Sequence, residues 1–68
     1  MMNMNKDADF LKMMIKHHDM ALDMSERYLR ESSPMTRQAR VADLARAIIN
    51  AQTEEIETMR SWLRQMKM

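Results

Sequence analysis

The sequence contains no glycine and a single proline, Pro34, and this strongly restricts the folds open to a chain of 68 residues. Glycine is the usual residue of tight turns, so a chain without it favours helices joined by few turns. The only cluster of helix-breaking residues is ESSPM at 31–35, and apolar residues keep a helical spacing on both sides of it. We therefore expect an all-α fold, an antiparallel helical hairpin with one short connection.

Local signals predict where the two helices begin and end. Asp7 is a suitable cap for the start of the first helix. Ser33 followed by Pro34 is typical of an N-cap with proline in the first helical position, so the second helix should begin there. The expected boundaries are a flexible Met-rich N-terminal tail over 1–6 and a single helical-hairpin domain over 7–68, with helices over about 7–31 and 34–66 and a turn over 32–34.

The apolar residues of both segments cover more surface than one neighbouring helix can bury. In the first segment they span an arc of roughly 220°, about twice the stripe that packing against a single helix requires. A lone hairpin would leave much of this surface exposed. We therefore expect two copies to form a homodimeric four-helix bundle. The central stripes are Phe10, Met14, His17, Ala21, Met24 and Tyr28 in the first segment, and Val41, Ala45, Ile48, Gln52, Ile56, Met59, Leu63 and Met66 in the second.

Composition and charge exclude several classes of function. The 11 basic residues are balanced by 10 acidic ones, so the basic excess of a nucleic-acid-binding domain is missing. Without cysteine the chain can form no disulfide, thiolate metal site or cysteine nucleophile. No apolar run approaches the roughly 20 residues of a membrane span. Because no nucleophile and base pair, phosphate loop or carboxylate dyad is recognisable, we expect a binding protein and not an enzyme.

Four polar residues interrupt the apolar stripes. His17 and His18 lie in the first segment, and Gln52 and Glu55 lie in the second. Burying such groups unpaired is costly, so they should contact one another or a ligand.

The expected turn predicts which of these residues meet. If the chain reverses near Ser33, residue n lies level with about residue 66 minus n, because both helices rise by about 1.5 Å per residue. His17 then lies level with Ile49, and Met14 lies level with Gln52. The sequence therefore predicts that Met14 and the four polar residues share one layer of the bundle.

These residue types favour a copper site. Imidazole is a common metal ligand, and its second ring NH usually binds a carboxylate or amide, a role that Gln52 and Glu55 could fill. Thioether sulfur is soft and selects Cu(I) over harder divalent ions. Spacings of three and four residues place a further set of donors along one side of the first helix: Met13, His17, Met20 and Met24.

Each feature also has a purely structural interpretation. Methionine at helical spacing is more often core filler than ligand. A histidine can simply form a hydrogen bond with Glu55 or Gln52, and buried polar residues can set the register between helices. The alternative hypothesis is therefore a structural or protein-interaction helical module without metal, in which His, Gln and Glu form a buried polar network. Filler methionine does not by itself predict two histidines in the same layer, which favours the copper hypothesis.

Two segments, DADFLKMMIKHHDMALDM at 7–24 and LARAIINAQTEEIETMRSWL at 44–63, resemble the family called domain of unknown function 305. This family comprises ferritin-like helical proteins, some of which bind copper in the bacterial envelope. The resemblance implies a location in the periplasm or cell envelope if a leader has been removed, and otherwise in the cytoplasm. It places five residues at family motif positions, namely His17, His18, Met14, Met24 and Met59, while Met13 and Met20 add to the local methionine content.

Together, these features predict a protein that sequesters or passes copper, with Cu(I) favoured and Cu(II) also considered, in copper tolerance or trafficking. Its expected partners are copper ions and a second copy of itself. The expected ligands are His17, His18, Met13, Met14, Met20, Met24 and Met59, with Gln52 and Glu55 orienting the histidines.

Overall fold

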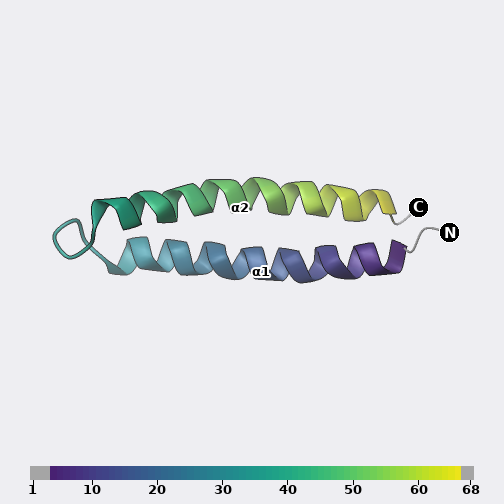
Figure 1. Ribbon diagram of the computed structural model, residues 1–68, viewed down its shortest axis with the longest axis horizontal. Helices are drawn as coiled ribbons and strands as arrows, with labels where there is room; N and C mark the ends of the chain where they lie inside the picture. Colours follow the sequence, from purple (N-terminus) through teal and green to yellow (C-terminus); the bar gives the residue numbers. More distant parts are fainter. Residues whose placement is uncertain (1–3, 67–68) are drawn as a thin grey trace.

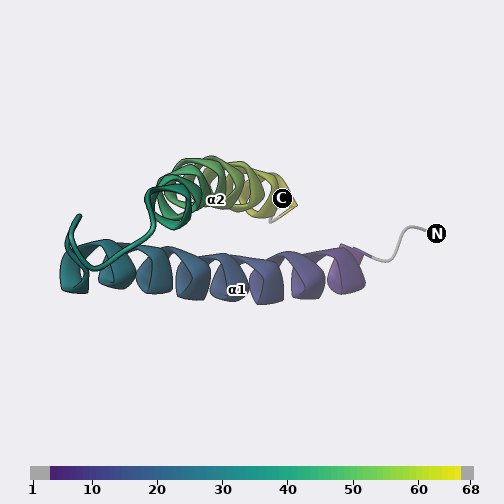
Figure 2. The same cartoon turned by 60° about the vertical axis from the view of Figure 1, so that its left-hand side comes forward.

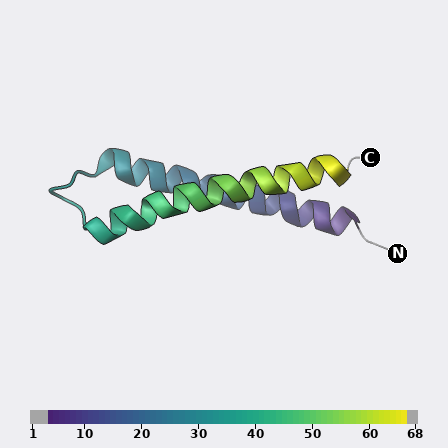
Figure 3. The same cartoon turned by 90° about the horizontal axis from the view of Figure 1, so that it is seen from above.

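The computed structural model describes residues 4–66, which form an antiparallel hairpin of two α-helices. Helix α1 spans Met4–Glu31 and helix α2 spans Ala39–Met66. The start of α1 and the end of α2 lie at the same end of the hairpin (Figure 1). Seen from above, the helices cross near their middle (Figure 3). The expected all-α helical hairpin is confirmed.

Each helix has only the other as a neighbour within the described hairpin (Figure 2). Charges near the helix ends support both helices, because Asp7 lies in the first turn of α1, and Arg30 and Arg64 lie in the last turns of α1 and α2. Residues 4–6 of the predicted tail belong to α1, and residues 1–3 lie outside the described residues. Neither described helix combines the length and apolar character needed to cross a membrane.

The connection between the helices is longer than expected. The carbonyl of Ser33 accepts hydrogen bonds from the backbone N–H groups of Thr36 and Arg37, at 3.0 and 3.1 Å, so a single turn does begin at Pro34. That turn does not continue, and α2 begins at Ala39 instead of Pro34. Two antiparallel helices pack with their axes about 8–10 Å apart. A connection over 32–38 lets the chain cross this distance before the second helix starts.

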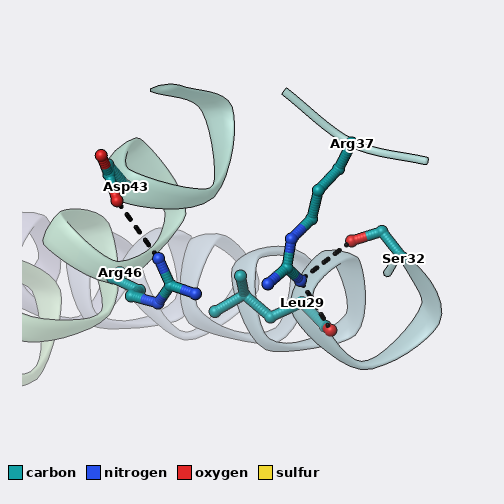
Figure 4. Close-up of polar contacts among 5 residues, drawn as sticks. All are labelled: Leu29, Ser32, Arg37, Asp43 and Arg46. Atoms are coloured by element: carbon teal, nitrogen blue, oxygen red, sulfur yellow. Dashed lines mark hydrogen bonds and ion pairs between the residues drawn. The ribbon is translucent and has the colours of Figure 1, made fainter. Parts of the chain in front are cut away.

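Arg37 caps the carbonyl end of α1 from this connection (Figure 4). Its Nη1 donates hydrogen bonds to the Leu29 carbonyl and to Ser32 Oγ, both at 3.3 Å. Ser32 Oγ in turn donates to the Tyr28 carbonyl at 2.6 Å. The last carbonyls of a helix lack partners within the helix, so these contacts stabilise its end.

The longer connection also changes the register between the helices. The predicted rule would place Ile48 level with His18, whereas in the structure His18 contacts Glu55, seven residues further along α2. Seven residues make about two helical turns, so the shift preserves the side of α2 that faces α1. Glu55 was expected in the same layer as the histidines and does contact His18, whereas Met59, not the expected Gln52, lines a hollow together with Met14.

The contact between the helices supplies a thin core. Its buried apolar side chains come from both helices, and two polar residues, His18 and Ser25, are buried with them. No apolar side chain in the described part of the chain is completely enclosed. A single pair of helices therefore buries little apolar surface. The buried apolar residues are Leu11, Ala42, Ala45, Ile56 and Met59.

The hairpin has an apolar face on one side. Its residues recur at helical spacing, so each set follows one side of its helix. Phe10 and Met14 of α1 line a hollow together with Trp62 of α2, which shows that the two sets lie on the same side of the hairpin. The apolar face comprises Phe10, Met14, Met24 and Tyr28 from α1, and Val41, Leu44, Ile48 and Trp62 from α2.

The opposite side is a charged face. Lys12 and Arg60 lie two positions from Phe10 and Trp62 respectively, which is about 200° around each helix. Lys12, Arg60 and Arg64 line a surface hollow there. Asp19 and Arg60 form an ion pair across the helices at 3.9 Å. The two-helix layer as a whole is therefore amphipathic.

Candidate functional site

His18 lies at the contact between the helices and is only 6% exposed. Its Nε2 is 2.5 Å from Oε1 of Glu55, which approaches from α2. The side chain of Glu55 is 58% exposed, so its carboxylate reaches the buried ring from the edge of the hairpin. When the carboxylate of Glu55 is ionised it can only accept hydrogen bonds, and in that pairing Nε2–H is the donor.

The other ring nitrogen of His18, Nδ1, is buried and has no hydrogen-bond partner within the described residues. In a neutral ring protonated at Nε2, Nδ1 carries a lone pair. Leaving a buried acceptor unpaired costs free energy, so such an atom calls for an explanation. Metal-binding histidines typically donate one ring N–H to a carboxylate and direct the other nitrogen to the metal. A His18 ring protonated at Nε2 fits that arrangement.

A hollow of about 270 Å³ lies beside His18 between the two helices. Three residues that carry soft or borderline donors, Met14, His18 and Met59, are part of its lining. Met59 is only 7% exposed. We call this site the Met–His hollow, and its lining is Phe10, Leu11, Met14, His18, Glu55, Thr58, Met59 and Trp62.

His17 lies outside the Met–His hollow on the exposed side of α1. Consecutive residues point about 100° apart around a helix, so His17 and His18 face different directions. Their ring centroids are 6.2 Å apart, with the rings in an edge-on arrangement. Three exposed methionines accompany His17 at spacings of three and four residues. We call this group the exposed strip, and it consists of Met13, His17, Met20 and Met24.

The predicted ligands thus fall into two groups. Met14, His18 and Met59 lie together in the Met–His hollow, while the other four predicted ligands form the exposed strip. Of the two residues expected to orient histidine, Glu55 contacts His18. Gln52 is half-buried, lies three residues before Glu55 and does not line the hollow.

Sequence reasoning gave no functional role to two aromatic walls of the hollow, Phe10 and Trp62. Phe10 belongs to the predicted stripe of the first segment, whereas Trp62 only flanks the predicted stripe of the second segment. Their place beside Met14 and Met59 depends on the register between the helices. That register was predicted two turns away from the observed one.

The donors of the hollow fit a soft monovalent ion better than a hard divalent one. Two thioethers and one imidazole suit Cu(I), whereas hard cations require several oxygen ligands. Within residues 4–66, no group of three or more His, Cys, Asp or Glu side chains is placed to hold a metal ion. Any metal held in the hollow would therefore depend on the sulfur atoms of Met14 and Met59.

Comparison with known proteins identifies the family. No curated protein and no solved structure matches the chain. The family described as a domain of unknown function (DUF305) matches residues 7–68, which is nearly the whole chain and includes all of α2 and all but the first three residues of α1. This chain therefore belongs to the DUF305 family.

Proposed function

We propose that this protein binds copper, preferentially Cu(I), and sequesters or passes it as part of copper tolerance or trafficking. The observation that carries the proposal is the Met–His hollow, where two thioethers lie beside a histidine whose buried Nδ1 has no partner among the described residues. The proposed role is binding and not catalysis.

The chemistry of the hollow supports Cu(I) in particular. Met14 and Met59 supply soft sulfur, and His18 supplies a nitrogen whose ring is oriented by Glu55. Phe10 and Trp62 provide apolar walls, and aromatic ring faces attract cations. Glu55 adds a negative charge next to the ring, which offsets the charge of a bound cation.

The exposed strip supplies a second type of donor group. Met13, Met20 and Met24 are each more than half exposed, and His17 is exposed between them. We propose that these side chains bind copper more weakly than the hollow does, including Cu(II) at His17. Met24 also belongs to the apolar face, so Met13 and Met20 are the methionines of the strip that remain at the surface when that face is covered. A donor set without thiols suits an oxidising compartment, so we place the protein in the periplasm or cell envelope.

We further propose that two copies form a four-helix bundle through their apolar faces. The chain exposes 5727 Å², whereas a compact monomer of 8.1 kDa is expected to expose about 4500 Å². The excess, about 1200 Å² per chain, is larger than the about 800 Å² that each partner buries in a standard interface. A second copy supplies the matching apolar surface.

One observation favours the alternative, a helical module without metal. The hydrogen bond between His18 and Glu55 crosses from α1 to α2, so this pair alone can fix the register of the hairpin. In that case the methionines only fill space, and the apolar face serves to bind a helical protein.

A competition titration separates the two functions. The apo protein is titrated with Cu(I) under anaerobic conditions against a chelator of known affinity, together with the variants His18→Ala, His17→Ala and Met35→Leu. We expect His18→Ala to weaken binding at least tenfold, His17→Ala to weaken it less, and Met35→Leu, in the connection, to have no effect. Copper should also raise the melting temperature of the wild type, because a ligand that binds only the native state stabilises it.

Equal competition by the wild type and His18→Ala would overturn the proposed site. No competition by the wild type, with an unchanged melting temperature at saturating Cu(I), would favour the module without metal.

A further inference from the structure

The Met–His hollow lies on the apolar face of the hairpin. The hollow and the apolar face share three residues, Phe10, Met14 and Trp62. A molecule that covers the apolar face therefore also covers the hollow. The exposed fractions of Phe10 and Trp62 are 57% and 51%, so the outer walls of the hollow are open in the single hairpin. His18 and Met59 form its buried floor.

The molecule that we propose to cover this face is a second copy. The opposite side carries Lys12, Asp19, Arg60 and Arg64, which are costly to bury, so one face of the layer is available for packing. Two copies joined by this same face form a closed pair and not an open chain, because the interface is self-complementary. The excess exposed area of about 1200 Å² per chain is sufficient for such a pair.

We propose that the second copy closes the Met–His hollow, so that Cu(I) binding and dimerisation are coupled. This inference rests on the proposed function, because it concerns the same copper site. In the single hairpin, the chain supplies the floor and side walls of the hollow, and water reaches it through the open apolar face. In the dimer, the partner's apolar face excludes that water, which strengthens the attraction between the ion and the Glu55 carboxylate.

The coupling is reciprocal. If dimerisation increases the affinity for Cu(I) by a given factor, Cu(I) must increase the affinity of the two copies for each other by a corresponding factor. Copper would therefore assemble the bundle, and the bundle would release copper less readily than the single hairpin. Dilution of the protein, or a molecule that competes for the apolar face, would separate the two copies and expose the hollow to water.

The test combines sedimentation equilibrium with Cu(I) titration. The dimer dissociation constant of the wild type is measured over a range of protein concentrations, without copper and with Cu(I) buffered by a chelator. We expect Cu(I) to lower this constant at least tenfold. The variant Leu44→Glu adds a charge to the apolar face outside the hollow, and should be monomeric and bind Cu(I) at least tenfold more weakly.

The matched control is Asn50→Glu, which adds the same charge to an exposed position about 120° around α2 from Leu44. It should behave as the wild type in both measurements. Circular dichroism shows whether Leu44→Glu is folded. If that variant does not fold, the concentration series on the wild type decides the question alone.

Three results would overturn the coupling: a wild type that is monomeric at all concentrations both without and with Cu(I), a dimer dissociation constant unchanged by Cu(I), or a folded monomeric Leu44→Glu with wild-type affinity. In the last case copper binding itself still stands. A dimer that binds no Cu(I) instead shows that the proposed function has failed.

Discussion

His18 and Glu55 connect the two helices through a hydrogen bond of 2.5 Å between Nε2 and Oε1, and the second nitrogen of the same ring is buried without a partner among the described residues. A purely structural histidine would be expected to have both nitrogens satisfied. Glu55 therefore holds the ring through one nitrogen and leaves the other nitrogen without a partner among the described residues. This relationship connects the stability of the hairpin to its proposed ability to bind copper.

Replacing Glu55 with alanine should destabilise the hairpin, because it leaves the buried Nε2 of His18 without its acceptor. Removing the partner of a buried polar group costs about 1–3 kcal/mol. We expect the lower end of this range, since Glu55 is largely exposed and water can partly replace it. Each kcal/mol corresponds to a decrease in melting temperature of about 4–8 °C for a domain of this size.

The control for Glu55→Ala is Glu57→Ala, which removes an exposed carboxylate two positions away. Thermal melts of both variants are compared at one protein concentration, because the melting temperature of a self-associating protein depends on concentration. Identical melting temperatures for the two variants would show that the His18 and Glu55 pair does not stabilise the hairpin.

Two replacements of Met59 separate packing from metal binding. Met59→Ala creates a cavity at a buried position and should lower the free energy of unfolding by about 2–5 kcal/mol. Met59→Leu conserves volume and should cost less than about 1.5 kcal/mol. Because leucine lacks the thioether, Met59→Leu should nevertheless weaken Cu(I) binding at least tenfold. Wild-type Cu(I) affinity in a stable Met59→Leu variant would remove this sulfur from the proposed ligands.

Arg37→Ala should destabilise the end of α1. The variant loses the hydrogen bonds from Nη1 to the Leu29 carbonyl and Ser32 Oγ. A net loss of about 0.5–1.5 kcal/mol is expected for such contacts. Arg40→Ala is the matched control, because Arg40 is exposed in the first turn of α2, where a positive charge opposes the helix dipole. In urea unfolding, the free energy of unfolding of Arg37→Ala should be lower than that of the wild type. The free energy of unfolding of Arg40→Ala should equal or exceed that of the wild type.

Oxidation of methionine by dilute peroxide should follow exposure. Among the methionines whose exposure the structure describes, Met35 in the connection is 95% exposed and should react first, while Met59 at the floor of the hollow is 7% exposed and should react last. Peptide mapping by mass spectrometry after timed exposure gives the rate at each position. Rapid oxidation of Met59 in the folded protein would contradict its burial.

Much of the site's composition could be predicted because helical spacing is a local property. The absence of glycine and the positions of Ser33 and Pro34 predict a hairpin, and Met14, His18 and Glu55 are recognisable as members of facing stripes. The separation of His17 from His18 was harder to foresee, because the wide apolar arc of α1 includes both residues. In the described hairpin, α2 buries only one side of this arc. His18 lies on that buried side, and His17 lies on the exposed side.

Which residue of α2 lies beside a given residue of α1 could not be predicted so directly. A turn placed at 32–34 makes Gln52 the neighbour of Met14, whereas the observed connection over 32–38 brings Glu55 and Met59 to this level. The difference arises from the single turn after Ser33, which does not continue into α2.

The sequence by itself determined that this chain forms two amphipathic helices and which side of each helix is apolar, because these properties depend on residue spacing within one helix. Only the tertiary structure decided that Met14, His18 and Met59 share one hollow and that His17 does not line it. The physical reason is that register depends on where the second helix begins. A few residues in the connection move that starting point, here from Pro34 to Ala39, without changing either apolar pattern.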